Sequence, residues 1–229
     1  KSQVLSDLPE KDEKTIYSGM EEEQRKLYLA AHKQLVDQLQ GIDSAYYEKN
    51  KIFILSQLTK LRQICCHPAL CYDDYQGSSA KLEACMELVQ RAVKGKHKVL
   101  LFSQFTSMLD LIRERLAEQN TKYYCLTGNT DKQERQRLVD EFQNDDTPVF
   151  LISLKAGGTG LNLTAADIVI HYDPWWNVAA QNQATDRAHR IGQKNTVTVY
   201  RLIAKDSLEE GIIKLQESKK ALSCLLYTS

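Results

Sequence analysis

Apolar residues recur every three or four positions through the first third of the chain, which is the spacing of an amphipathic helix. A capping-box pattern at residues 18–21 predicts where the first helix begins. The residue before a proline disfavours helical geometry, so the second helix should end at His67. The two apolar stripes consist of Tyr28, Ala31, Leu35 and Leu39, and of Ile54, Leu58, Leu61 and Cys65.

From Lys81 onward, helical stripes alternate with short runs of apolar, β-prone residues. Strands separated by helices are typical of an α/β fold with a parallel sheet, here with about five strands. A last helix should start near Asp206, whereas the tail from Cys224 loses the charged helical texture. The β-prone runs lie at residues 99–102, 123–126, 149–152, 168–170 and 197–200.

The composition is that of a globular protein, with 42% hydrophobic and 26% charged residues. No apolar run approaches the roughly 18 residues that span a bilayer, so no membrane partner is expected. Thirty basic residues balance thirty acidic ones, so that any nucleic-acid contact must come from a local patch. No oligomer is predicted.

The six cysteines contain no C-x-x-C pair and are interpreted as reduced thiols. A zinc site at residues 65–71 is rejected. Adjacent cysteines cannot easily turn toward one ion, and no second ligand pair follows at finger spacing. No metal site is therefore predicted.

Ligands bind at the carboxyl ends of the strands in an open parallel sheet, so the loops after the strands are the candidate sites. One loop carries glycines at positions 157, 158 and 160, which let backbone N–H groups approach a phosphate, together with Lys155 and Thr159. A tight turn packed on a strand explains the glycines equally well, and the dinucleotide fingerprint G-x-G-x-x-G is absent. The four loops, expected on one edge, cover residues 103–106, 127–130, 153–162 and 173–177.

Two adjacent tryptophans, Trp175 and Trp176, stand in the last of these loops. Tryptophan at a loop tip is costly unless it packs or binds something. We expect one of the two to be buried and the other to bind a ligand, although core packing is the better explanation for either one alone.

Arg187 and Arg190 are three positions apart, which predicts that they share one face of a helix. Guanidinium groups bind phosphate oxygens bidentately and stay charged, so a fixed pair can stabilise charge that develops during phosphoryl transfer. A solvated helix face is the plainer explanation for such a pair in isolation.

In this order and spacing, the segments resemble the C-terminal helicase lobe and linker of Swi/Snf-type, superfamily-two DNA-dependent ATPases. The resemblance covers about residues 1–222 and departs at Val178, where the family commonly has proline. It implies a RecA-like (P-loop NTPase-type) lobe at residues 80–205, preceded by the end of the first-lobe region and a helical linker (1–79). A brace-like helix and the atypical tail follow (206–229). The matching segments are residues 61–68 (linker helix), 99–104 (motif IV), 153–163 (motif V), 173–177 (tryptophan element) and 183–193 (motif VI).

Carried over by position, the resemblance assigns three sets of residues. Arg187 and Arg190 would be arginine fingers that reach ATP bound on another lobe. The nucleotide cleft would be lined by Gly158, Gly160, Asn162 and Gln183. The backbone of double-stranded DNA would be contacted by Gln104, Thr127, Lys155 and Trp176.

Neither a G-x-x-x-x-G-K-[ST] phosphate loop nor a D-E-x-H element occurs in the 229 residues. The resemblance places both in an upstream RecA-like lobe of the same polypeptide, which would bind most of the ATP and Mg. The chain is therefore interpreted as the second lobe of an ATP-dependent DNA translocase or remodeller, inactive alone. A non-catalytic DNA or protein docking module is the alternative. Compact spacing favours a bacterial, nucleoid-associated cytoplasmic protein over a nuclear one.

Overall fold

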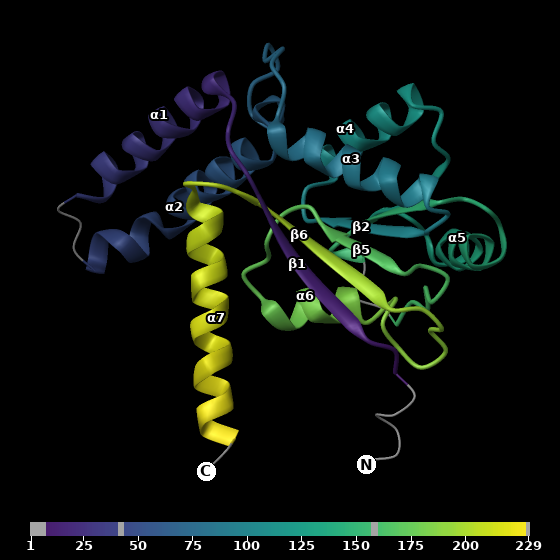
Figure 1. Ribbon diagram of the computed structural model, residues 1–229. Helices are drawn as coiled ribbons and strands as arrows, with labels where there is room; N and C mark the ends of the chain where they lie inside the picture. Colours follow the sequence, from purple (N-terminus) through teal and green to yellow (C-terminus); the bar gives the residue numbers. More distant parts are fainter. Residues whose placement is uncertain (1–7, 41–43, 157–159, 228–229) are drawn as a thin grey trace.

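A computed structural model of the chain describes residues 8–40, 44–156 and 160–227. Over these residues the chain forms one all-parallel sheet of six strands in the order β1-β6-β5-β2-β4-β3, flanked by helices (Figure 1). The strands are β1 (Lys11–Ser18), β2 (Val99–Ser103), β3 (Tyr123–Leu126), β4 (Val149–Ser153), β5 (Ile168–His171) and β6 (Val197–Ala204). The helices are α1 (Glu22–Leu39), α2 (Ser44–Cys66), α3 (Ala80–Lys94), α4 (Thr106–Glu118), α5 (Lys132–Asn144), α6 (Val178–Thr185) and α7 (Leu208–Tyr227).

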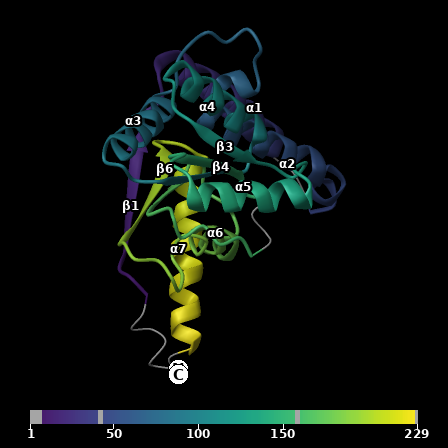
Figure 2. The ribbon, with the colours of Figure 1, turned by 90° about the vertical axis from the view of Figure 1, so that its right-hand side faces the viewer.

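Helices cover both faces of the sheet, α3 and α4 on one and α5 and α6 on the other (Figure 2). Successive side chains of a strand point to opposite faces, so β2 contributes to both cores. Val99 and Leu101 pack with α3 and α4, whereas Leu100 and Phe102 pack with α5 and α6. All residues of β2 and β4 are buried, as expected for central strands covered on both sides.

A third apolar cluster joins α1, α2 and the end of β6, with Leu208 of α7 packed against it. Its core includes Tyr28, Leu35 and Leu61. The buried side chain of Gln24 donates a hydrogen bond to the carbonyl of Ile64, 2.8 Å away, and so satisfies one of the last carbonyls of α2. The linker helices are thereby fixed to the sheet domain.

The sequence-based prediction of about five strands was wrong by one, because it missed β1. Ser18, expected in a capping box, pairs instead with Ala204 as the last residue of β1. Its backbone is thus committed to the sheet, and the N-cap of α1 is Glu21, which makes no side-chain cap bond.

The predicted end of the second helix is confirmed, since α2 stops at Cys66, directly before His67. The last helix begins at Leu208, as predicted to within two residues. The tail from Cys224, which lacks the charged helical texture, continues α7 as far as Tyr227. None of the helices in the described ranges is long and apolar enough to cross a membrane.

Candidate functional site

The four predicted DNA contacts follow four neighbouring strands, at the carboxyl edge of the sheet. Because all strands are parallel, the structure confirms that the four loops leave the sheet at one edge. Neighbouring strands lie about 4.8 Å apart, so the row spans about 15 Å. In spatial order the row is Thr127 after β3, Lys155 after β4, Gln104 after β2 and Trp176 after β5.

The members of this row differ in how freely they can reach a ligand. Lys155 is exposed, and Trp176 keeps 42% of its surface accessible. Thr127 is half-buried in a tight turn, in which its N–H donates to the hydroxyl of Thr130. Gln104 is also half-buried, and its side-chain amide donates to the carboxylate of Asp173. Lys155 and Trp176 are therefore the most accessible of the four.

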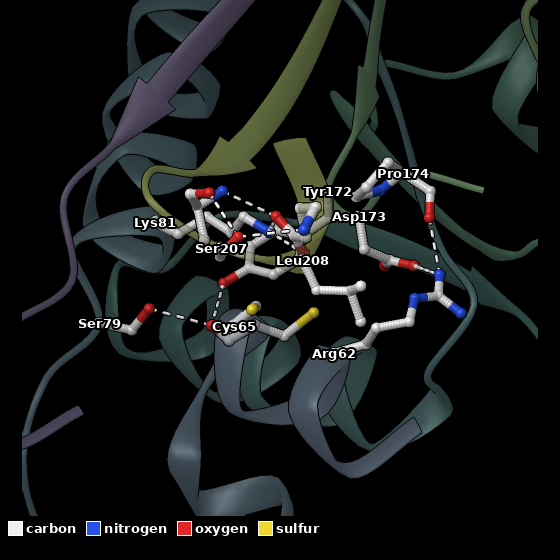
Figure 3. Close-up of polar contacts among 12 residues, drawn as sticks. Arg62, Cys65, Ser79, Lys81, Tyr172, Asp173, Pro174, Ser207 and Leu208 are labelled. Atoms are coloured by element: carbon white, nitrogen blue, oxygen red, sulfur yellow. Dashed lines mark hydrogen bonds and ion pairs between the residues drawn. The ribbon is translucent and has the colours of Figure 1, made fainter. Parts of the chain in front are cut away.

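Asp173 ties the loop after β5 to the loop after β2. Its buried carboxylate accepts hydrogen bonds from the Ser103 hydroxyl at 2.5 Å and from the Gln104 N–H at 3.3 Å. A guanidinium nitrogen of Arg62, on α2, lies 4.0 Å away (Figure 3). Burial raises the pKa of Asp173 above its ordinary value, although Ser103 and Arg62 both act to lower it.

Helix α7 holds the same loop from a third side. Gln216 donates from its side chain to the carbonyl of Trp175, whose N–H donates to the Gln181 side chain at 3.2 Å. One tryptophan was expected to be buried and the other to bind a ligand. Trp175 is only half-buried, whereas Trp176 is exposed. Trp176 is the one available to a ligand.

Arg187 and Arg190 lie beyond the opposite end of α6. The prediction that they share one helical face was wrong, because α6 ends at Thr185 and residues 186–192 form turns. Both nevertheless line one pocket of about 430 Å³. Arg187 is 5% exposed, whereas Arg190 is open to solvent. The described lining consists of Leu8, Leu161, Gln183, Asp186, Arg187, His189, Arg190 and Ile191.

The side chain of Gln193 fixes the turn that carries these arginines. Its amide nitrogen donates to the carbonyls of Thr164, Ala166 and Ala188 at 3.1, 2.8 and 3.1 Å. Its oxygen accepts from the N–H groups of Lys194 and Asn195. The segment with the arginines is thereby fastened to the segment that precedes β5.

The electrostatics of the pocket favour an anion. Burial, and then the positive charge of Arg190, lower the pKa of Arg187, while Asp186 raises it. A bound phosphate would relieve the repulsion between the two guanidinium groups. Within the described ranges no group of three or more His, Cys, Asp or Glu side chains is placed to hold a metal ion.

The remaining predicted nucleotide contacts are only partly brought together. Gln183 is exposed on α6 and lines the pocket. Gly160 and Asn162 are exposed on either side of Leu161, which lines it. Gly158 lies outside the described residues.

Comparisons with known proteins bear on this arrangement. Residues 80–192 match the helicase conserved C-terminal domain, and residues 1–70 match the SNF2-related domain. The SWI2/SNF2 ATPase C-terminal domain of Sulfolobus solfataricus is 34% identical with a TM-score of 0.77, over 92% of this chain and 87% of that one. The chain belongs to the SWI2/SNF2 family. Its fold is accordingly the RecA-like fold of that family's ATPases.

Other SWI2/SNF2 relatives extend the likeness. The Sulfolobus solfataricus SWI2/SNF2 ATPase core in complex with dsDNA is 36% identical with a TM-score of 0.80, over 97% of this chain and 47% of that one. An uncharacterized ATP-dependent helicase of Mycoplasma pneumoniae is 41% identical over 97% of this chain and 21% of its own length. The ISWI chromatin-remodeling complex ATPase ISW1 of Saccharomyces cerevisiae is 34% identical over 99% and 21%. The chain thus spans about a fifth of these curated relatives.

Several residues that build the two sites of this SWI2/SNF2 chain had no assigned role in the sequence analysis. Arg62 stands four positions after Leu58 and four before Cys66, so it interrupts an apolar helical stripe with a charge. That signal marks a buried arginine that needs a partner. Asp173, Gln193 and Gln216 carry no comparable signal, because their partners lie far away in the sequence or are backbone groups.

Proposed function

We propose that this chain is the second lobe of an ATP-dependent translocase that moves along double-stranded DNA. It contributes a row of contacts to the DNA backbone and two arginine fingers. One observation carries the proposal: Trp176, at one end of the carboxyl-edge row, and the two-arginine pocket lie at opposite ends of α6. That helix has eight residues and is therefore about 12 Å long. DNA and ATP could then bind at the same time, and α6 could couple their binding.

The row suits a duplex of any sequence. The ammonium group of Lys155, the hydroxyl of Thr127 and the amide of Gln104 can contact phosphate oxygens, which carry no sequence information. The name of one relative's structure records a complex with double-stranded DNA, which supports duplex DNA as the ligand. Binding that depends on phosphates should weaken steeply with salt.

The pocket suits the phosphates of ATP but does not complete a hydrolytic site. Arg187 and Arg190 supply positive charge for a developing phosphoryl transition state. The described lining includes one carboxylate, Asp186, and ATP-bound Mg would be held by the upstream lobe. The names of the ATP-dependent relatives support ATP as the nucleotide.

Steady-state ATP hydrolysis tests the proposal. The chain should be compared with a longer protein in which the upstream lobe is joined to it, each with and without duplex DNA. We expect DNA-stimulated hydrolysis by the longer protein and none by the chain alone. Duplex binding without hydrolysis in both proteins would support a non-catalytic docking module instead, and hydrolysis by the chain alone would contradict the split site.

A further inference from the structure

Arg62 reaches from the linker helix α2 into the loop after β5. Its guanidinium donates a hydrogen bond to the Pro174 carbonyl at 2.7 Å and forms an ion pair with Asp173 (Figure 3). The side chain is 7% exposed, and 112 residues separate Arg62 from Pro174 in the sequence. This contact therefore joins two distant parts of the chain inside the molecule.

The same guanidinium lies close to two aromatic rings. Its central carbon is 5.5 Å from the ring centroid of Trp176 and 5.7 Å from that of Phe105. Both distances fall within the range of a cation–π interaction. Trp176 belongs to the loop after β5 and Phe105 to the loop after β2, so Arg62 touches both loops.

Asp173 extends this arrangement to Gln104. The carboxylate that pairs with Arg62 also accepts from the Gln104 side-chain amide and backbone N–H. Arg62 is thus one contact away from Gln104 and in direct contact with Trp176. These are two of the four residues in the row at the carboxyl edge.

We infer that Arg62 is a positioning residue for duplex binding, which holds Trp176 and, through Asp173, Gln104 in place. The inference rests on the proposed function, since it concerns the same DNA surface. Arg62 does not contact DNA itself, because it is buried. Arginine suits this position because one planar group can donate to a carbonyl, pair with a carboxylate and lie against aromatic rings, which the ammonium of lysine cannot combine.

The nearby buried pair of Lys81 and Glu209 does not serve the same purpose. Lys81 donates to Glu209 at 2.6 and 2.7 Å, and Glu209 accepts from the N–H of Ala204. These bonds join α3, β6 and α7 below the row. Arg62, by contrast, bonds directly to the loop that carries Trp176.

Binding of a fluorescein-labelled DNA duplex to the chain, followed by anisotropy, tests the inference. Arg62→Gln and Arg62→Lys should each weaken binding about tenfold, the loss of one well-placed contact. Trp176→Ala should weaken it at least as much. The double variant Arg62→Gln/Trp176→Ala should bind little worse than Trp176→Ala, because Arg62 acts largely through that ring. Fully additive losses, or wild-type binding by Arg62→Lys, would overturn the inference.

Two further readouts separate positioning from general stability. Acrylamide should quench tryptophan fluorescence more strongly in Arg62→Gln than in wild type, since the Trp176 ring loses its contact. The slope of log affinity against log salt should stay unchanged in Arg62→Gln but fall by about one in Lys155→Ala, which removes a phosphate contact. Unchanged quenching, or a lower slope in Arg62→Gln, would count against a positioning role.

Arg115→Gln is the matched control. Arg115 lies in the last turn of α4 and donates to Glu83 at 2.7 and 2.9 Å, so its loss also removes an arginine–carboxylate pair. We expect wild-type duplex affinity and quenching in this variant. If Trp176→Ala weakens binding but Arg62→Gln does not, the inference fails and the proposed function stands. If wild-type protein binds no duplex, the proposed function fails first.

Discussion

The two ends of α6 face two sites that are built differently. At its N-terminal end, Asn177 caps the helix by accepting from the N–H groups of Ala179 and Ala180 at 3.0 and 3.3 Å. The loop before it is bonded to α2, β2 and α7 through side chains. At its C-terminal end, α6 passes into turns that are fastened by the buried Gln193, by a backbone bond from Leu163 to Arg187 and by the contact of His189 with the Pro9 carbonyl. The pocket beyond contains an exposed arginine.

This difference indicates which site can act without another lobe. The carboxyl-edge row is assembled and braced entirely by residues of this chain. The pocket presents two guanidinium groups, and its described lining holds a single carboxylate. Under the proposed function, the pocket would be completed by the upstream lobe, whereas the row would bind duplex DNA without it. Variants in the pocket should therefore change ATP hydrolysis, whereas variants in the row should change duplex binding.

The largest effect is expected at the arginine pocket. In a protein with its upstream lobe, Arg190→Ala should lower kcat for ATP hydrolysis about 10³-fold or more, because an arginine finger stabilises the transition state. Affinity for ATP and for duplex DNA should change little, as steady-state hydrolysis and equilibrium binding would show. Arg137→Ala removes another exposed arginine, on α5, and should hydrolyse ATP normally. Near-normal turnover by Arg190→Ala would show that Arg190 is not an arginine finger.

A smaller effect, on stability, is expected at the buried pair near the carboxyl-edge row. The side chains of Lys81 and Glu209 are 2% and 0% exposed, and Lys81→Met leaves the carboxylate buried without its cation. Breaking a buried pair in this way costs about 3–5 kcal/mol, measurable by urea denaturation. Replacing both partners, Lys81→Met/Glu209→Leu, should recover part of the loss. Lys26→Met, which breaks the exposed pair with Glu22, is the control. Equal midpoints for Lys81→Met and Lys26→Met would contradict this account.

Most of the fold could be predicted from the sequence because buried elements show apolar periodicity. The strand β1 shows how this signal fails. Its burial pattern is mostly exposed, and it is held at the sheet edge by backbone bonds to β6 and by the ion pair of Glu13 with Arg201. A strand that buries little has no apolar stripe to detect.

The candidate site was predictable to a different extent at its two ends. Strand order and direction alone place the loops after β2 and β5 together, since these strands are neighbours. The backbone beyond Thr185 could not be predicted, because the helix ends where Thr185 bonds to His171 in another element. The bracing contacts of Arg62 and Gln216 depend on partners that only the folded chain brings near.

A moderate effect is expected at the turn that carries the arginines. Gln193→Ala removes the hydrogen bonds that this side chain donates to three carbonyls, among them the buried carbonyl of Ala166, at about 2 kcal/mol in free energy of unfolding. Gln193→Glu keeps the size of the side chain but directs a carboxylate oxygen at the same carbonyls. It should lower the free energy of unfolding at least as much. Urea denaturation measures both, with the exposed Gln136→Ala as control. A wild-type midpoint for Gln193→Ala would show that the turn does not depend on this side chain.

A further effect depends on pH and arises at His171, the last residue of β5. Burial, and next the charge of Arg201, lower the pKa of His171 to about 3, although Glu13 raises it, and the ring bonds to Thr185 at 2.9 Å. An unfolded histidine titrates near pH 6.5. Between about pH 6.5 and 3 the unfolded state therefore binds the extra proton, so stability falls as pH falls, by up to about 1.4 kcal/mol per pH unit. Above that window His171 adds no pH dependence.

His171→Gln should remove this slope, and the exposed His32→Gln should retain it, in urea denaturation between pH 7.5 and 4.5. The Thr185 hydroxyl donates to the Gln181 carbonyl, so the Nε2–H of His171 is the donor to Thr185. Acid would therefore protonate the buried Nδ1, which has no hydrogen-bond partner, and the folded state resists that proton. Equal slopes in wild type and His171→Gln would contradict the lowered pKa of His171.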